Sequence, residues 1–363
     1  MRFVSFVFVR VIFGSTFDQW MINTERAEDV HREGPNLYDN RENVMLPSGS
    51  MLILNFLLWH TSTSTIWDVS QHPNLLVKYQ IYFPDESVII HPLSREYYYM
   101  KRIQNLHISP KVIHLSGPTN LDNFENVPHK FAFRLSNTER EECRGQPVRF
   151  MLIKKIDGPS LSELWRHSIS MKTIVQIGQQ MITVLQKLHT VGGIQHGDVH
   201  SGNWVIDRNA GRLFLIDFGM AQLIRQTHIP DPLEPFKNHV LFSPWEQAGY
   251  SPEPRDDVYR AVFILAEFVV GHTRLVEWFA GKSGPAAIEA KLTVDLFNVG
   301  QPAPTIIGTV ATNVLGLVFP TQPPPVAPQW TRIMRIVQEM QPNTPPPYEE
   351  ILTELVSIYQ SIV

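Results

Sequence analysis

The most constraining feature of the sequence is the polar stretch His196-Gly197-Asp198-Val199-His200-Ser201-Gly202-Asn203, which is followed by Asp217-Phe218-Gly219. The apolar run Leu213–Ile216 leads directly into Asp217 and is typical of a strand. Two carboxylates and one amide, Asp198, Asp217 and Asn203, therefore follow one another along a short segment. These three groups set the chemistry that we expect of the chain.

The three side chains match what the transfer of a phosphoryl group requires. One carboxylate can orient an acceptor hydroxyl and accept its proton, while an amide and a second carboxylate can hold the divalent metals that bridge the phosphates. Oxygen atoms are the ligands that Mg²⁺ requires. We therefore predict Asp198 as the catalytic base and Asn203 and Asp217 as metal ligands, with ATP and Mg²⁺ as cofactors.

The motif HxDxxxxN followed by DFG resembles the catalytic and metal-binding loops of the protein kinase superfamily. Five other segments resemble parts of the same family. They are Ile156–Leu161 after the hinge, Leu188–His196 at the end of the helix before the catalytic loop, Ser243–Glu246 at the end of the activation segment, Asp257–Tyr259 at the start of the helix behind the catalytic loop, and Tyr348–Leu352 in the last helix. The resemblance implies an α+β, two-lobed, protein-kinase-like fold with a small sheet-rich N-lobe and a larger helical C-lobe.

The order of the patterns along the chain agrees with that fold class, because strand patterns come first and helix patterns later. We expect an N-terminal tail or linker over residues 1–47, an N-lobe and hinge over 48–158, and a C-lobe over 159–363. In the N-lobe, strands are predicted within 52–83 and over Val148–Ile153, a helix over Ser94–Gln104, and a loop over 117–147.

Apolar residues recur at three- and four-residue steps from Met171 onward, which predicts a long amphipathic helix that ends at Gly192-Gly193. A second helix is predicted over 256–270, with Asp256 as its N-cap. A final helix is predicted over Glu349–Tyr359.

The resemblance also implies a lysine on an N-lobe strand and a glutamate on the helix that follows. Lys78, in Leu75-Leu76-Val77-Lys78, fits the lysine, and Glu96 fits the glutamate. Lys78 would contact the phosphates and Glu96 would orient it. The alternative is an exposed lysine and a glutamate on a helix surface.

The phosphate-binding loop departs from the family pattern. The glycine-rich motif aligns with Trp59–Ile66, which contains no glycine. Glycine there lets backbone N–H groups approach the phosphates closely. Hydroxyls of Thr61 and Ser64 are predicted to replace those contacts, and Ile66, with Lys154 and Ile156 of the hinge, completes the predicted ATP-binding set.

Other departures leave the function open. Gly197 stands where the family usually has an arginine that pairs with a phosphorylated activation segment, and Leu76 stands where it prefers alanine. The preferred interpretation is a protein serine/threonine kinase. A pseudokinase that acts as a binding or scaffold module is one alternative, and a small-molecule kinase of the aminoglycoside or choline kinase type is another.

The composition of the chain bears on its partners and its location. A net charge of −4 over 363 residues gives no reason to expect nucleic acid. The single cysteine, Cys143, suits a reducing compartment, so an intracellular, cytoplasmic location is expected, although Arg2–Val9 weakly resembles a signal peptide. No later segment has the length and apolarity of a transmembrane helix.

Overall fold

The computed structural model describes the following residues: 42–45, 51–60, 64–69, 72–81, 92–116, 119–120, 147–164, 169–224, 243, 252–270 and 327–362. These residues form a mixed structure of helices and antiparallel sheet, as the α+β prediction requires. The chain divides into two compact units. Unit 1 comprises Met1–Gly158, Ile206–Arg212 and Ile216–Gly219, and unit 2 comprises Pro159–Val205, Leu213–Leu215 and Met220–Val363.

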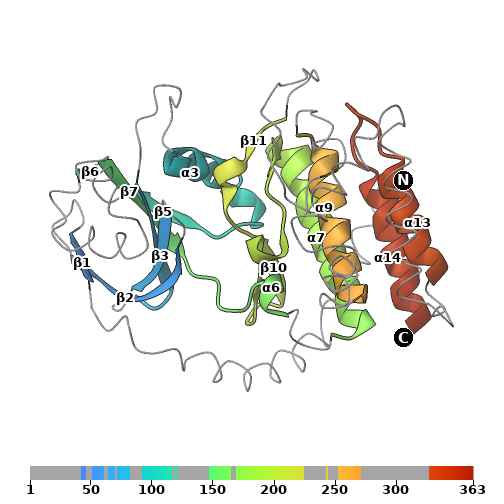
Figure 1. Ribbon diagram of the computed structural model, residues 1–363, viewed down its shortest axis with the longest axis horizontal. Coiled ribbons are helices and arrows are strands. Elements are labelled where there is room, and N and C mark those ends of the chain that lie inside the picture. The colour runs from blue at the N-terminus through green and yellow to red at the C-terminus, as the bar shows by residue number, and fades with distance from the viewer. Residues whose placement is uncertain are drawn as a thin grey trace, which may run out of the picture. The chain divides into compact units, whose positions relative to one another are not determined.

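Unit 1 is built on one antiparallel sheet with the strand order β1-β2-β3-β4-β7-β5, in which β6 also pairs with β7 (Figure 1). The strands are β1 (Glu42–Met45), β2 (Met51–His60), β3 (Ser64–Val69), β4 (Leu75–Ile81), β5 (Val112–Leu115), β6 (Thr119–Asn120) and β7 (Pro147–Lys154). Strands were predicted within 52–83 and over 148–153, and both predictions are confirmed. Of the tail predicted over 1–47, only β1 is described, and it pairs with β2.

Strand β7 lies inside the sheet, and its residues Phe150, Met151, Leu152 and Ile153 are all buried. An unbroken apolar run is what a strand covered on both faces requires. Helix α3 (Pro92–Arg102) packs against β5 and β7, which confirms the helix predicted over 94–104. After β7 the chain reaches Gly158, where a Cβ atom would come within 1.8 Å of the carbonyl oxygen of Ile206.

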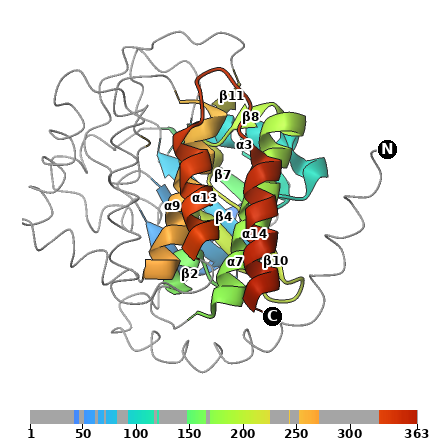
Figure 2. The same ribbon diagram turned by 90° about the vertical axis from the view of Figure 1, so that its right-hand side faces the viewer.

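Unit 2 is mainly helical. Its longer helices are α7 (Met171–Lys187), α9 (Pro254–Val270), α13 (Ala327–Gln338) and α14 (Tyr348–Ile362), and α6 (Leu161–Leu164) is a short one. Helix α7 packs against α9 and α14, and α13 and α14 lie side by side (Figure 2). At Gly178 a Cβ atom would lie 2.8 Å from Leu265 Cδ1, so this glycine allows α7 and α9 to approach closely.

The start of α9 corrects a prediction. Asp256 was expected to be the N-cap, but the helix begins at Pro254, so Asp256 lies in its first turn. Its carboxylate accepts a hydrogen bond from the backbone N–H of Glu253 at 2.6 Å. This is the reciprocal half of a capping box, and proline is favoured at the first helical position because its missing N–H needs no partner there.

The end of α7 also differs from the prediction. The α-helix ends at Lys187 and continues as a π-helical turn over Leu188–Gly192, before Gly193 ends it with a φ of 66°. The sequence predicted the glycine stop but not the wider turn. Beyond it, β8 (Ile194–Gln195) pairs with β11 (Gln222–Leu223), and β9 (Trp204–Asp207) pairs with β10 (Arg212–Leu215), whose residues belong to both units.

No helix among the described residues is both long enough and apolar enough to cross a membrane.

Candidate functional site

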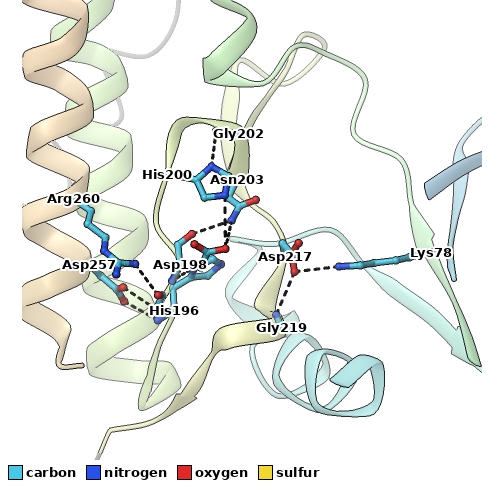
Figure 3. Close-up of polar contacts among 11 residues, drawn as sticks. Lys78, His196, Asp198, His200, Gly202, Asn203, Asp217, Gly219, Asp257 and Arg260 are labelled. Carbon is cyan, nitrogen blue, oxygen red and sulfur yellow. Dashed lines mark hydrogen bonds and ion pairs between the residues drawn. The ribbon is translucent and has the colours of Figure 1, made fainter. Parts of the chain in front are cut away.

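The predicted catalytic and metal-binding residues fall into two groups, one in each unit. Figure 3 labels Lys78 and Asp217 of the first group and Asp198 and Asn203 of the second. We call Lys78, Glu96 and Asp217 the lysine cluster, which belongs to unit 1, and His196–Asn203 the catalytic loop, which belongs to unit 2.

In the lysine cluster, Lys78 Nζ lies 2.8 Å from Glu96 Oε2 and 3.1 Å from Asp217 Oδ1. Strand β4 carries Lys78 in the middle of the sheet, next to the fully buried Val77. Helix α3 carries Glu96 in the same buried stripe as Leu93 and Met100. A carboxylate in an apolar stripe is costly unless it is paired, and here the partner is Lys78.

The charges of this cluster depend on one another. Burial disfavours the charged form of Lys78, but the carboxylates of Glu96 and Asp217 outweigh that effect and raise the pKa of Lys78 above its usual value. Burial raises the pKa of Glu96 to about 7, although Lys78 acts in the opposite direction. Lys78 therefore stays protonated at neutral pH.

Asp217 differs from its two partners because its side chain is 44% exposed. Its backbone has a φ of 60°, which is uncommon for a residue with a side chain. The N–H of Gly219 donates to Asp217 Oδ1 at 3.3 Å and helps to hold the carboxylate in place. Asp217 is thus both anchored to Lys78 and accessible to a ligand.

In the catalytic loop, Asn203 turns its amide nitrogen toward Asp198. Asn203 Nδ2 donates to the Asp198 backbone carbonyl at 2.9 Å and to Asp198 Oδ2 at 3.2 Å. Since both bonds use the nitrogen, they leave the amide oxygen of Asn203 available for a cation. The imidazole Nδ1 of His200 accepts from the N–H of Gly202, and its Nε2 lies 3.7 Å from Asp198 Oδ2.

The backbone of the catalytic loop is fixed from behind by Asp257 of α9. The carboxylate of Asp257 accepts from the N–H of His196 at 2.6 Å and from the N–H of Gly197 at 3.0 Å. Burial alone would raise the pKa of Asp257, but hydrogen bonds and positive charge from His189 and His196 keep it below its usual value. The carboxylate is therefore ionised when it holds the loop.

The donor chemistry fits Mg²⁺ with nucleotide phosphates. Within the described part of the chain, no three or more His, Cys, Asp or Glu side chains form a cluster that could hold a metal ion. Proteins usually bind Mg²⁺ through one or two carboxylates together with water and substrate phosphates. Asp217 of unit 1 offers an exposed carboxylate and Asn203 of unit 2 offers an amide oxygen, so each unit carries one oxygen donor of the kind that Mg²⁺ prefers.

The predicted ATP-binding residues are only partly described. Thr61 lies outside the described residues, and so does the Ser64 side chain, whereas Ile66 and Ile156 are half-buried and Lys154 is exposed. The backbone N–H of Lys154 donates to the carbonyl of Lys111 at 2.8 Å. That N–H is therefore occupied within the protein, so a contact of Lys154 with adenine would use another of its groups. Glu246 also lies outside the described residues.

Two residues near the catalytic loop were absent from the predicted set. Arg260 of α9 donates to the carbonyl of Gly197 at 2.6 Å, and the hydroxyl of Tyr348 lies 2.6 Å from His189 Nδ1. Arg260 could have been singled out from the sequence, because it is a single cation next to the apolar run Ala261–Leu265 of α9. Tyr348 was recognised only as the first residue of the family-like last helix, and nothing in the sequence linked it to the catalytic loop.

Residues 147–241, which include the catalytic loop and Asp217, match the ABC1 atypical kinase-like domain. A curated relative, "Casein kinase I homolog 1" of Saccharomyces cerevisiae (strain ATCC 204508 / S288c), is 37% identical over 222 residues. The alignment covers 55% of this chain and 38% of the length of that relative.

Proposed function

We propose that this protein-kinase-like chain is an ATP-dependent phosphotransferase in which Asp198 is the general base. The observation that carries the proposal is the lysine cluster, in which a buried lysine joins a buried glutamate and an exposed aspartate. An incidental pair of charged side chains would lie on the surface, because burying charged groups costs free energy that only well-placed partners offset. We also propose that units 1 and 2 are the small and large lobes of the fold.

Each residue has a proposed role in the transfer. Lys78 contacts the nucleotide phosphates, and Glu96 keeps its ammonium group in place. Asp217 and the amide oxygen of Asn203 hold Mg²⁺, which when bound would neutralise charge that develops on the phosphates. Asp198 orients the acceptor hydroxyl and accepts its proton. His200 lies beside Asp198 and helps to fix the direction of its carboxylate.

For the acceptor we propose a serine or threonine hydroxyl of a protein. The likeness to a casein kinase I homolog supports this choice. The match to an ABC1 atypical kinase-like domain leaves a small-molecule acceptor as the second candidate. The sequence His196-Gly197-Asp198 in the catalytic loop, which resembles that of small-molecule kinases, also favours this candidate. A protein acceptor and a small-molecule acceptor can be separated by testing transfer to each class directly.

Nucleotide binding is the first property to test, because Trp59–Ile66 contains no glycine. We expect ATP with Mg²⁺ to raise the Tm of the full chain, since a ligand that binds only the native state stabilises it by mass action. The shift should be lost in Asp217→Asn and kept in Glu339→Gln, which removes an exposed carboxylate from outside the proposed site. No shift at millimolar ATP would favour a pseudokinase.

A further inference from the structure

We infer that Arg260 and Tyr348 are positioning residues that set the direction of Asp198, an inference that rests on the proposed role of Asp198 as the base. Neither residue belongs to the predicted site, and neither reaches the substrate in the inferred mechanism. Arg260 acts directly on the Gly197–Asp198 peptide group, and Tyr348 acts through two other side chains on the peptide group before it (Figure 3 shows Arg260).

The Gly197–Asp198 peptide group is held at both of its polar ends. Arg260 Nη1 donates to its carbonyl oxygen at 2.6 Å, and its N–H, which belongs to Asp198, donates to His196 Nδ1 at 3.3 Å. A peptide group is planar, so fixing its oxygen and its N–H fixes the plane. The Cα of Asp198 lies in that plane, and the direction of its side chain depends on it.

The contact from Arg260 is of a strong kind. Its guanidinium is a charged donor, and charge-assisted hydrogen bonds are shorter and stronger than neutral ones. Arg260 is buried, with 2% of its surface exposed, and the next five residues of α9, Ala261–Leu265, are apolar and buried. Burial of a cation at this position lowers the stability of the fold unless a polar contact compensates for it. The hydrogen bond to the carbonyl of Gly197 is such a contact.

The preceding peptide group, which contains the N–H of Gly197, is held through a chain of three side chains. Asp257 Oδ1 accepts from that N–H, and Asp257 Oδ2 lies 2.9 Å from His189 Nε2. His189 Nδ1 in turn lies 2.6 Å from the hydroxyl of Tyr348, at the start of α14. All three side chains are buried. Because Asp257 is an ionised acceptor, the Nε2 of His189 carries the hydrogen of that bond.

The π-helical turn is what places His189 between its two partners. The turn spans Leu188–Gly192, directly after α7, and wider turns of this kind are frequently found at functional sites. Burial first, and the charge of Asp257 second, raise the pKa of Tyr348 above its usual value. Tyr348 therefore keeps its hydrogen at neutral pH and can fix the ring of His189 without adding a charge.

The two residues are expected to contribute unequally. Arg260 touches the peptide group of Asp198 itself, whereas Tyr348 is separated from the loop by His189 and Asp257. Small misplacements of a catalytic group can cost about 100-fold in rate. We expect Arg260→Met to lower kcat by about 10- to 100-fold, Arg260→Lys to recover part of the loss, and Tyr348→Phe to lower kcat less than Arg260→Met does.

The test compares the full-length wild type with Arg260→Met, Arg260→Lys and Tyr348→Phe, and uses Arg335→Met, at an exposed arginine of α13, as the matched control. Two readouts are taken. Steady-state kinetics should show a fall in kcat with an unchanged KM for ATP, because Lys78 and Asp217 are not altered. Hydrogen–deuterium exchange over residues 194–203 should become faster in Arg260→Met and, less so, in Tyr348→Phe, but not in the control.

The exchange measurement keeps the inference testable apart from the proposed function. If the wild type transfers no phosphate, the proposed function fails, and unchanged exchange in Arg260→Met and Tyr348→Phe would still overturn the inference separately. In an active protein, a kcat within twofold of wild type for Arg260→Met would overturn it. Should Arg260→Met fail to fold, Tyr348→Phe, which removes only one hydroxyl, decides the question by the same two readouts.

Discussion

Lys78 Nζ lies 2.8 Å from Glu96 Oε2, and both side chains are almost fully buried. The two residues come from a central strand and from the helix packed on the same sheet, so the fold of unit 1 brings together a cation and an anion that are distant in sequence. Neither side chain lies on the exposed surface of unit 1.

Replacing one partner of the pair should affect function and stability together. In Lys78→Met the carboxylate of Glu96 loses its cation, and breaking a buried pair in this way costs about 3–5 kcal/mol. We expect a lower free energy of unfolding and loss of the ATP-dependent rise in Tm. The double variant Lys78→Met/Glu96→Gln removes the buried charge of Glu96 as well, and the remaining carboxylate of the lysine cluster, that of Asp217, is 44% exposed.

Denaturant unfolding of the two variants gives the measurement. The double variant should recover most of the lost stability but should still show no response to ATP. If Lys78→Met alone kept the response to ATP, Lys78 would not be the phosphate contact.

Gly197 should tolerate no side chain. Its φ is 76°, in the left-handed region, and a Cβ atom would lie 2.9 Å from the backbone carbonyl oxygen of Met220. We expect Gly197→Ala to lower the free energy of unfolding by about 1–3 kcal/mol and to lower kcat, because the loop would shift.

Gly197→Arg, which introduces the residue usual in the protein kinase superfamily, should be at least as harmful as Gly197→Ala. Chemical denaturation together with kinetics measures both effects. An arginine variant more active than wild type would show that the loop can adopt another backbone and would contradict this account of Gly197.

Glu267 should make stability depend on pH. Burial raises its pKa from 4.5 to about 7. A raised folded-state pKa gives stability that is present below the unfolded-state pKa and lost as the pH rises through the folded-state value. At about 1.4 kcal/mol for each pKa unit, the loss approaches roughly 3 kcal/mol at pH 8.

Glu267→Gln cannot ionise, so it should become more stable relative to wild type as the pH rises from about 4.5 to about 8. The difference in the free energy of unfolding between the two proteins, measured by denaturant at several pH values, isolates Glu267 from other titrating groups. A difference that stays constant over this range would exclude a raised pKa.

Gly178 should report the close packing of α7. A Cβ atom there would lie 2.8 Å from Leu265 Cδ1 and 3.3 Å from Leu355 Cδ2. Overpacking a core usually costs about 1–3 kcal/mol, so Gly178→Val should lower the Tm without changing the response to ATP.

The smaller substitution Gly178→Ala is the comparison for this prediction. It should cost less than valine, since leucine tips can shift and alanine favours the helix. A valine variant as stable as wild type would mean that α9 and α14 can move away from α7 at no cost.

Much of this architecture could be predicted from the sequence. The resemblance to the protein-kinase-like superfamily is confirmed by the match over residues 147–241 and by the 37% identical relative. Local sequence patterns were sufficient to predict α3, β7 and α7, because apolar periodicity and a glycine that ends a helix depend only on residues close together in the sequence. They also led to Lys78 and Glu96, which the structure brings within 2.8 Å of each other.

What the sequence could not predict depends on contacts between distant residues. The π-helical turn places His189 between Asp257 and Tyr348, a geometry that no local pattern encodes. The bond from Arg260 to Gly197 joins residues far apart in sequence. The N-terminus of α9 was misplaced by two residues, because a Pro at the first helical position and a capping aspartate two residues later give competing signals.

The proposed role of Asp198 as the general base is the central claim, and one measurement tests it most directly. It is the transfer of labelled γ-phosphate from ATP by the full chain in Mg²⁺, offered protein serine and threonine acceptors in one series and small alcohols in another, for wild type and Asp198→Asn. We predict Mg²⁺-dependent transfer to protein by the wild type, and a loss of about 100-fold or more in Asp198→Asn with ATP binding retained. Equal transfer by the two proteins, or none by either while ATP still binds, would contradict the account.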